Sequence, residues 1–198
     1  MFLTKNLLFI HIPKSAGTSI VHLLEKNFLG QKNFSIDTHS SYDVFKKNFP
    51  ELVVNKKTFC IVRNPYCRFV SIYRFINREV KLKKWFGSNY SKISTKIDTF
   101  EKFIENFEFP EKMWGDNNQF TNQIIWSNNV DNVFKIEEKN KLCSFLKDVG
   151  VVGDLPILNN RQNPSWVNNL YREYYNENTK KIIKKKFKDD LEFFGYNF

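Results

Sequence analysis

The chain has 198 residues, enough for one domain with a substantial core, and we predict a single domain over residues 1–198. A hydrophobic share of 41%, with 21 Phe, 8 Tyr and 4 Trp, excludes a disordered chain. The formal net charge of +10 favours anionic partners but selects none, because lysine runs along helices are commonly solvated faces.

Cysteine usage and hydropathy bear on metal binding and cellular location. Cys60, Cys67 and Cys143 lack zinc-ligand spacing, so we predict no metal site. Their odd number favours a reducing compartment. The N-terminus does not fit a signal peptide, and no apolar run approaches the ~20 residues of a membrane-spanning helix. We therefore expect a soluble, cytoplasmic protein with no transmembrane segment.

Strand and helix patterns alternate through the first part of the chain. Apolar runs predict strands, and apolar residues at helical spacing predict helices. The first strand is expected to be buried on both faces, and Thr18 or Ser19 is expected to cap the first helix. The elements predicted are strands at 7–12, 34–37 and 57–62 and helices at 18–28, 40–49 and from Pro65 onward. This alternation indicates an α/β fold with an open parallel sheet flanked by helices.

The pattern is less regular beyond residue 80. Residues 80–98 read as a loop, and Gly150 is expected to end a helix in "EEKNKLCSFLKDVG". Further helices are predicted at 99–107 and around 117–126, and a strand at 132–137. One or two amphipathic helices close the chain, and their buried stripe is predicted to be Ile182, Ile183, Phe187, Leu191 and Phe194.

The stretch "FIHIPKSAGTS" places small, hydroxylated residues and one cation directly after the first strand. A turn between a strand and a helix directs backbone N–H groups and the positive end of the helix dipole at one spot. The residues expected to hold an anion there are Lys14, Ser15, Ala16, Gly17, Thr18 and Ser19. The order differs from the G-x-x-x-x-G-K-[ST] loop of P-loop NTPases. An ordinary turn with a surface lysine is the alternative.

A second strand-to-helix junction carries "RNPYCRFVS". Arg63 ends the strand and can grip a phosphate with its planar guanidinium, and Ser71 follows about two turns later. Loops at the carboxyl ends of neighbouring parallel strands converge on one crevice. Two anion-binding loops there imply a ligand with two separated anionic groups. In the alternative, Arg63 pairs with a carboxylate and Ser71 is a small residue at a helix contact.

The two stretches together resemble the carbohydrate sulfotransferases of the Golgi type. The resemblance implies a P-loop-NTPase-like sheet and 3′-phosphoadenosine 5′-phosphosulfate (PAPS) as co-substrate. The first loop would bind the 5′-phosphosulfate, and Arg63 and Ser71 the 3′-phosphate. The chain lacks the N-terminal membrane anchor of Golgi members, so a soluble bacterial- or virus-type form is expected, with its acceptor open.

Weaker likeness extends over nearly the whole chain, in "NVFKIEE", "ILNNRQ" and "FKDDLEFFGYNF". Asn160 and Arg161 are expected as further contacts to the nucleotide. The reaction implied is in-line transfer of a sulfuryl group to a hydroxyl of a carbohydrate or other acceptor. Lys14 would offset charge on the bridging oxygen, so no metal is needed. Aromatic residues that could stack on a sugar are Trp85, Tyr90, Trp114 and Trp126, although core positions are the alternative.

The acceptor hydroxyl has to lose a proton, and a histidine is suited to take it. His39 follows the strand predicted at 34–37 and therefore lies at the same sheet edge as the two loops, so we predict it as the general base. His11 and His22 are expected to be structural, and Asp37 and Glu137 are weaker candidates.

Three other functions stay open at this point. A nucleotide-dependent kinase with a divergent phosphate loop would bind Mg²⁺-ATP, but the lysine precedes the glycine here. A nucleic-acid-binding module would use the basic charge, yet no motif of that kind is present, so we expect no nucleic-acid partner. The third alternative is a member of the sulfotransferase family that binds the nucleotide but does not catalyse transfer.

Overall fold

The computed structural model describes residues 1–28, 39–81, 98–106, 121–155 and 170–198. The chain divides into two compact units, each with an apolar core, and each is described by itself. The first comprises Met1–Arg63 and Pro110–Leu158, and the second comprises Asn64–Phe109 and Asn159–Phe198. The single domain expected over residues 1–198 stays a prediction.

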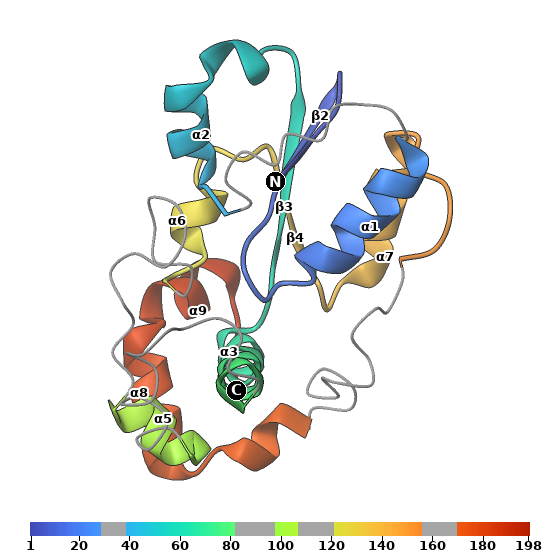
Figure 1. The fold of residues 1–198 in the computed structure, drawn as a ribbon. Helices are drawn as coiled ribbons and strands as arrows, with labels where there is room; N and C mark the ends of the chain where they lie inside the picture. The colour runs from blue at the N-terminus through green and yellow to red at the C-terminus, as the bar shows by residue number, and fades with distance from the viewer. Residues whose placement is uncertain (29–38, 82–97, 107–120, 156–169) are drawn as a thin grey trace. The chain divides into compact units, whose positions relative to one another are not determined.

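A four-stranded sheet forms the centre of the first unit, in the order β1-β2-β3-β4 (Figure 1). Its strands are β1 (Phe2–Leu3), β2 (Leu7–Ile10), β3 (Lys57–Val62) and β4 (Asn132–Lys135). β2, β3 and β4 are parallel, as predicted, whereas β1 runs antiparallel to β2. Thr4 stabilises the turn between β1 and β2, because its hydroxyl accepts the Leu7 N–H at 3.0 Å. The α/β fold is confirmed, with this short edge strand as the addition.

Both faces of the central strands are buried. Side chains alternate across a strand. One face therefore contributes Phe9, Phe59 and Ile61 to the main core, together with α1 and α7 residues such as Leu24 and Leu142. The other face carries four residues with 0% exposure, which are Leu8, Ile10, Cys60 and Val62. This confirms the strands as buried on both faces, which requires helices on both sides of a parallel sheet.

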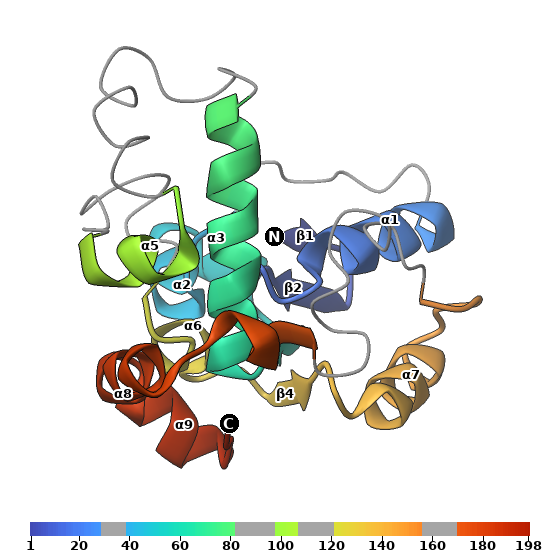
Figure 2. The ribbon, with the colours of Figure 1, turned by 90° about the horizontal axis from the view of Figure 1, so that it is seen from below.

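The helices of the first unit lie on both sides of its sheet. They are α1 (Gly17–Asn27), α2 (Tyr42–Asn48), the 3₁₀ turn η1 (Pro50–Leu52), α6 (Ile124–Ser127) and α7 (Lys139–Asp148). α1 and α7 lie on one side, and α2 and α6 on the other (Figures 1 and 2). Gly150 ends α7 as predicted. Its φ of 84° lets the Val151 N–H reach the Leu146 carbonyl at 2.8 Å, the pairing of a Schellman cap.

The second unit is helical and has an aromatic core. It contains α3 (Pro65–Lys81), α5 (Phe100–Asn106), η3 (Leu170–Tyr174), α8 (Glu177–Lys186) and α9 (Lys188–Phe194) (Figure 2). The Phe69 ring on α3 lies 5.2–6.2 Å from the ring centroids of Phe100, Phe103 and Phe187. Of the stripe predicted for the closing helices, Ile182 is half-buried and the other four residues are buried.

Two of the predicted elements fall wholly or mostly outside the described residues. The strand predicted at 34–37 lies outside them, as does most of the loop predicted at 80–98. Within the described ranges, no helix combines the length and the apolar character needed to cross a membrane.

Candidate functional site

The loop between β2 and α1 has an unusual backbone. Lys14 and Ala16 have φ values of 65° and 64°, in the left-handed region that residues other than glycine seldom adopt. Such a conformation costs about 1–3 kcal/mol for each residue and concentrates at functional sites. Left-handed Ala16 is followed directly by right-handed Gly17, the first residue of α1. Adjacent residues of opposite hand make a concave nest of N–H groups that suits an anion.

The first turn of α1 is not closed by a side chain. Its N-cap is Ala16, whose methyl group cannot accept a hydrogen bond. The expectation that Thr18 or Ser19 caps the helix is wrong, because the left-handed Ala16 starts the helix at Gly17. The N–H groups of Gly17 and Thr18 lie in the first turn, where no intrahelical acceptor exists. These groups and the helix dipole can therefore serve an anion, beside the half-buried Lys14.

Gly17 is required because the His11 ring lies against it. A Cβ atom on Gly17 would come within 1.8 Å of His11 Cδ2. The imidazole is buried, and this burial lowers its pKa well below 6.5; the nearby charges of His39, the N-terminal amine and Lys14 add to the effect. His11 is therefore neutral at neutral pH and fills space beneath the loop, in keeping with the structural role expected for it.

His39 lies beside the same loop. Its Nδ1 is 3.3 Å from the main-chain carbonyl oxygen of His11, and the two imidazole centroids are 4.7 Å apart. Because a carbonyl oxygen only accepts hydrogen bonds, this contact assigns the proton of neutral His39 to Nδ1. Nε2 then carries the lone pair, which is the arrangement that a general base needs.

The structure places Arg63, the first residue of the second predicted loop, against the first loop. The Arg63 guanidinium donates from Nη1 to the Lys14 carbonyl oxygen at 3.3 Å, and only 6% of Arg63 is exposed. Both residues belong to the first unit and follow the carboxyl ends of adjacent parallel strands. Two basic residues, 49 positions apart in the chain, therefore lie at one sheet edge.

A third residue, which the sequence analysis missed, joins the two loops. Gln123 directly precedes α6 and is 0% exposed. Its Oε1 accepts the Ser15 hydroxyl at 3.0 Å and the Arg63 N–H at 2.9 Å, and its Nε2 donates to the Arg63 carbonyl at 2.8 Å. These partners lie 108 and 60 positions away in the sequence. In the sequence, Gln123 is only a polar amide before a short helix, and nothing near it points to Ser15 or Arg63 as its partners.

The other predicted site residues are distributed differently. Ser71 is on α3 in the second unit and is 2% exposed, so its role stays a prediction. Glu137 is exposed in the turn after β4. Trp126 is 0% exposed and belongs to the core, so its assignment to a sugar platform is wrong. The predicted residues that lie outside the described ranges are Asp37, Trp85, Tyr90, Trp114, Asn160 and Arg161.

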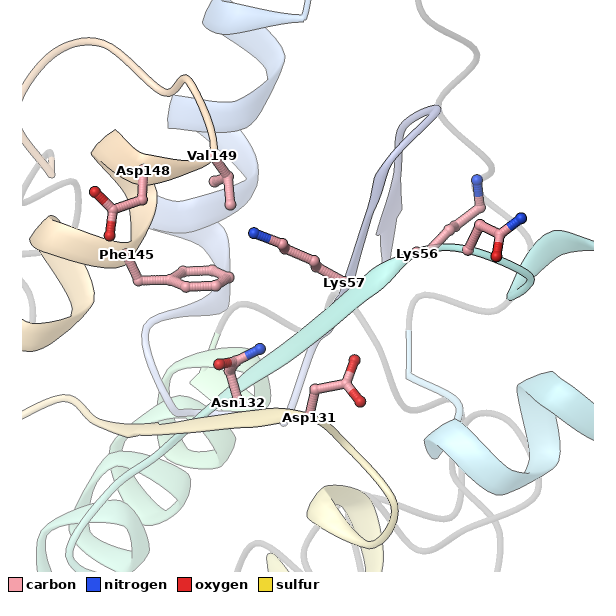
Figure 3. Close-up of a pocket in the computed structure, with 8 residues that line it drawn as sticks. Lys56, Lys57, Asp131, Asn132, Phe145, Asp148 and Val149 are labelled. Carbon is pink, nitrogen blue, oxygen red and sulfur yellow. The ribbon is translucent and has the colours of Figure 1, made fainter.

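A cavity of about 400 Å³ lies elsewhere in the first unit (Figure 3). Lys57 at the start of β3 and Asn132 at the start of β4 line it, and the Lys57 amine extends toward Phe145 and Val149. These are the amino ends of the strands, whereas the two loops follow carboxyl ends. In a parallel arrangement the two kinds of end lie at opposite edges, so this cavity is not part of the candidate site.

Lys14 and Arg63 follow the carboxyl ends of adjacent parallel strands, which is the edge at which open α/β sheets bind their ligands. A protein-family model described as "Sulfotransferase family" matches residues 1–197, so the chain belongs to the sulfotransferase family. This confirms the resemblance drawn from the two loops, and with it the expectation of a sulfotransferase.

The solved structures support the fold. One similar structure is that of mouse sulfotransferase SULT7A1 complexed with PAP. It matches with a TM-score of 0.57 and 15% sequence identity, over 96% of this chain and 86% of that chain. A comparison with curated proteins found no match.

Proposed function

We propose that this chain transfers a sulfuryl group from PAPS to a hydroxyl of a carbohydrate acceptor, without a metal ion. The observation that carries the proposal is the contact between the Arg63 guanidinium and the Lys14 carbonyl, which places Arg63 beside the first loop at one sheet edge. Membership of the sulfotransferase family supports it. The mouse enzyme of similar fold is described as a complex with PAP, which we take as adenosine 3′,5′-bisphosphate, the product of such a transfer.

The residues of the first unit fit this co-substrate. The uncapped N–H groups of Gly17 and Thr18 and the left-handed backbone at Ala16 make a concave anion site. Lys14 adds a cation beside it. Arg63 presents a second cationic group beside the first loop, where its guanidinium donates to the Lys14 carbonyl. Two such groups match a nucleotide with separated phosphates. Ser71, Asn160 and Arg161 are proposed as additional nucleotide contacts.

PAPS supplies an activated sulfuryl group when it is bound. Lys14 and the N–H groups of Gly17 and Thr18 would orient the phosphosulfate, whereas the Ser15 and Ser19 N–H groups donate to the carbonyls of Ile12 and Ala16. Lys14 would also stabilise the negative charge that develops on the oxygen between sulfur and phosphorus. In phosphoryl transfer that charge is largely neutralised by metal ions, and here the ammonium and the backbone donors take that place. Arg63 would hold the 3′-phosphate.

His39 is proposed as the general base. A hydrogen bond from Nδ1–H to the His11 carbonyl would hold the ring and leave the Nε2 lone pair to accept the proton of an acceptor hydroxyl. Replacing His39 with Ala is expected to lower kcat by about 10²–10⁴-fold and to remove the acidic limb of its pH profile. His22→Ala, in the half-buried middle of α1, is the matched control. An unchanged kcat in His39→Ala would exclude this role.

The nucleotide proposal is tested by calorimetry with PAP and with ADP, each with and without Mg²⁺. We expect metal-independent binding that favours PAP, and we expect Arg63→Ala to abolish that preference because the 3′-phosphate contact is lost. Equal affinity for both nucleotides, or binding that needs Mg²⁺, would instead indicate a kinase.

The acceptor is tested with labelled PAPS and a panel of saccharides, glycosides and tyrosine peptides. The carbohydrate assignment rests on the family resemblance of the two loops. Transfer to saccharides but not to tyrosine peptides is the expected result, and the reverse selectivity would replace the acceptor class while leaving the co-substrate unchanged.

We further propose that residues 1–198 act as one sulfotransferase-like domain in a reducing compartment, the cytoplasm. The matched family region runs through both compact units. Cys60, Cys67 and Cys143 are all free thiols, as is usual where disulfides do not form. Unfolding followed by calorimetry should then show one transition with coincident probes, and two separated transitions would show independent domains.

A further inference from the structure

We infer that Gln123 is a positioning residue that sets the spacing between the two nucleotide loops, and that the preference for a 3′-phosphate depends on it. The inference rests on the proposed function, because it concerns how Gln123 holds Ser15 and Arg63, which belong to the two loops proposed to bind one nucleotide. Gln123 itself is buried and is not proposed to touch the nucleotide.

The hydrogen bonds of Gln123 fix both its orientation and the backbone of Arg63. Oε1 faces two donors, the Arg63 N–H and the Ser15 hydroxyl, and Nε2 faces an acceptor, the Arg63 carbonyl. A flipped amide would oppose like groups at both contacts with the Arg63 backbone, so one orientation is favoured, and the Ser15 hydroxyl donates to the oxygen in that orientation. Arg63 directly follows β3, and Gln123 engages both its N–H and its C=O as a neighbouring strand would.

The contacts form a closed circuit through both loops. The Arg63 guanidinium donates to the Lys14 carbonyl, the Arg63 N–H donates to Gln123, and Gln123 accepts the hydroxyl of Ser15, the residue after Lys14. Ser15, Arg63 and Gln123 are each at most 6% exposed, so water does not readily replace a lost partner. Removing Gln123 therefore leaves the Arg63 backbone without this anchor, while the Arg63 and Lys14 side chains are unchanged.

The test compares Gln123→Ala with Thr58→Val. Thr58 lies in β3 and is buried like Gln123. Its hydroxyl donates to Asp131 Oδ2 and accepts the Asp131 N–H, both at 2.8 Å. That pair joins β3 and β4 near their amino ends, away from the loops. Both variants lose buried hydrogen bonds, so both are expected to lower Tm. Only Gln123→Ala is expected to weaken binding of PAP, by about 10-fold to 100-fold, and to reduce the ratio of PAP to ADP affinity by about tenfold.

Two further variants keep the inference falsifiable if Gln123→Ala does not fold. Gln123→Glu keeps the volume but replaces the Nε2 donor with an oxygen facing the Arg63 carbonyl, and it should also reduce the PAP to ADP ratio. Ser15→Ala leaves both bonds to the Arg63 backbone, so its effect on PAP affinity should be only about threefold. In an Arg63→Ala background, Gln123→Glu should add little to the loss of PAP binding, because the group it positions is absent.

The outcomes separate this inference from the proposed function. If the native chain binds PAP and ADP equally, the proposed function fails and the inference fails with it. If the native chain prefers PAP and the Gln123 variants lower Tm while keeping that preference, as Thr58→Val should, then Gln123 only stabilises the fold and the inference alone is overturned.

Discussion

The helices that follow β2 and β3 begin in different ways, although the sequence presents both as a strand, a turn and a helix. α1 begins after Ala16, a left-handed residue that offers no side-chain cap. α3 begins at Pro65, after Asn64, whose Oδ1 accepts the Tyr66 N–H at 3.0 Å. Proline at the first position and asparagine at the cap are the favoured pair for a closed helix start.

If the two loops bind anions as proposed, this difference implies that they do so by different chemistry. At α1 the first-turn N–H groups are left for a ligand, so the backbone and the helix dipole can contribute. At α3 the cap side chain already satisfies one of these donors, and an anion there depends more on a side chain, Arg63. A lysine next to N–H groups without an intrahelical acceptor is suited to stabilise the negative charge that develops during sulfuryl transfer. A planar guanidinium suits a phosphate that only has to be held.

Among the changes that test this contrast between the two helix starts, the largest effect is expected from Lys14→Ala. Loss of a charge-stabilising donor next to the reacting group should lower kcat of sulfuryl transfer by about 10²–10³-fold. Alanine meets the same steric penalty as lysine at a φ of 65°, so the backbone cost is nearly unchanged and Tm should move little. Initial rates at saturating PAPS measure the change.

Lys26→Ala is the control for Lys14→Ala. Lys26 is exposed in the last turn of α1, so its removal subtracts the same charge from the other end of the helix. It is expected to leave kcat within about twofold, since surface charges contribute little at a distance. If kcat fell equally in the two variants, Lys14 would act only through the overall charge of the protein and not at the reacting group.

A smaller effect, on stability, is expected from Gly17→Ala. The added Cβ would overlap His11 Cδ2 at 1.8 Å, so the ring or the helix start has to move. Overpacking of this kind costs about 1–3 kcal/mol. The change is measured as a loss in the free energy of unfolding by urea titration.

The His11→Ala background tests the cause of the Gly17 effect. Removing the imidazole opens the space, so the cost of Gly17→Ala should fall to less than half in the double-mutant cycle. If the full cost persists without the ring, the backbone conformation at Gly17 rather than His11 would account for it. α3 begins with a proline rather than a glycine, which is why this test applies to the first loop only.

The sequence was sufficient for the sheet and for the pairing of the loops, for physical reasons. β3 was predicted with its observed bounds because its apolar run, Phe59–Val62, lies between charged or polar residues. Lys14 and Arg63 were expected at one edge because parallel strands place their carboxyl ends together, and the 3.3 Å contact agrees. Both predictions depend on local patterns and one general rule of sheet topology.

Other features depend on the folded chain and could not be predicted from local patterns. The left-handed Ala16 occurs at a residue with no intrinsic preference for that conformation, so the start of α1 was misassigned. Gln123 was missed because its partners are distant in sequence and a buried amide leaves no periodic signal. Trp126 was offered as a surface platform because hydrophobic composition does not show which aromatic residues are buried.

The smallest effect is expected from Asn64→Ala, which removes the cap of α3. Loss of an N-cap costs about 1 kcal/mol. The Asn64 Nδ2 also donates to the Asn197 carbonyl at 2.7 Å, a contact that ties the C-terminal segment to the start of α3. Tm should fall by a few degrees, as about 2–4 °C per kcal/mol is usual at this length, while the affinity for PAP changes less than twofold.

Asn64→Asp separates the two contacts of Asn64. The aspartate keeps an oxygen for the Tyr66 N–H and adds charge at the favoured end of the helix dipole, but it cannot donate to Asn197. We therefore expect Asn64→Asp to recover most of the Tm lost in Asn64→Ala. If Asn64→Ala instead weakened PAP binding tenfold with Tm unchanged, the start of α3 would be a ligand site like that of α1. The two loops would then share one chemistry, and the contrast between an open and a closed helix start would be lost.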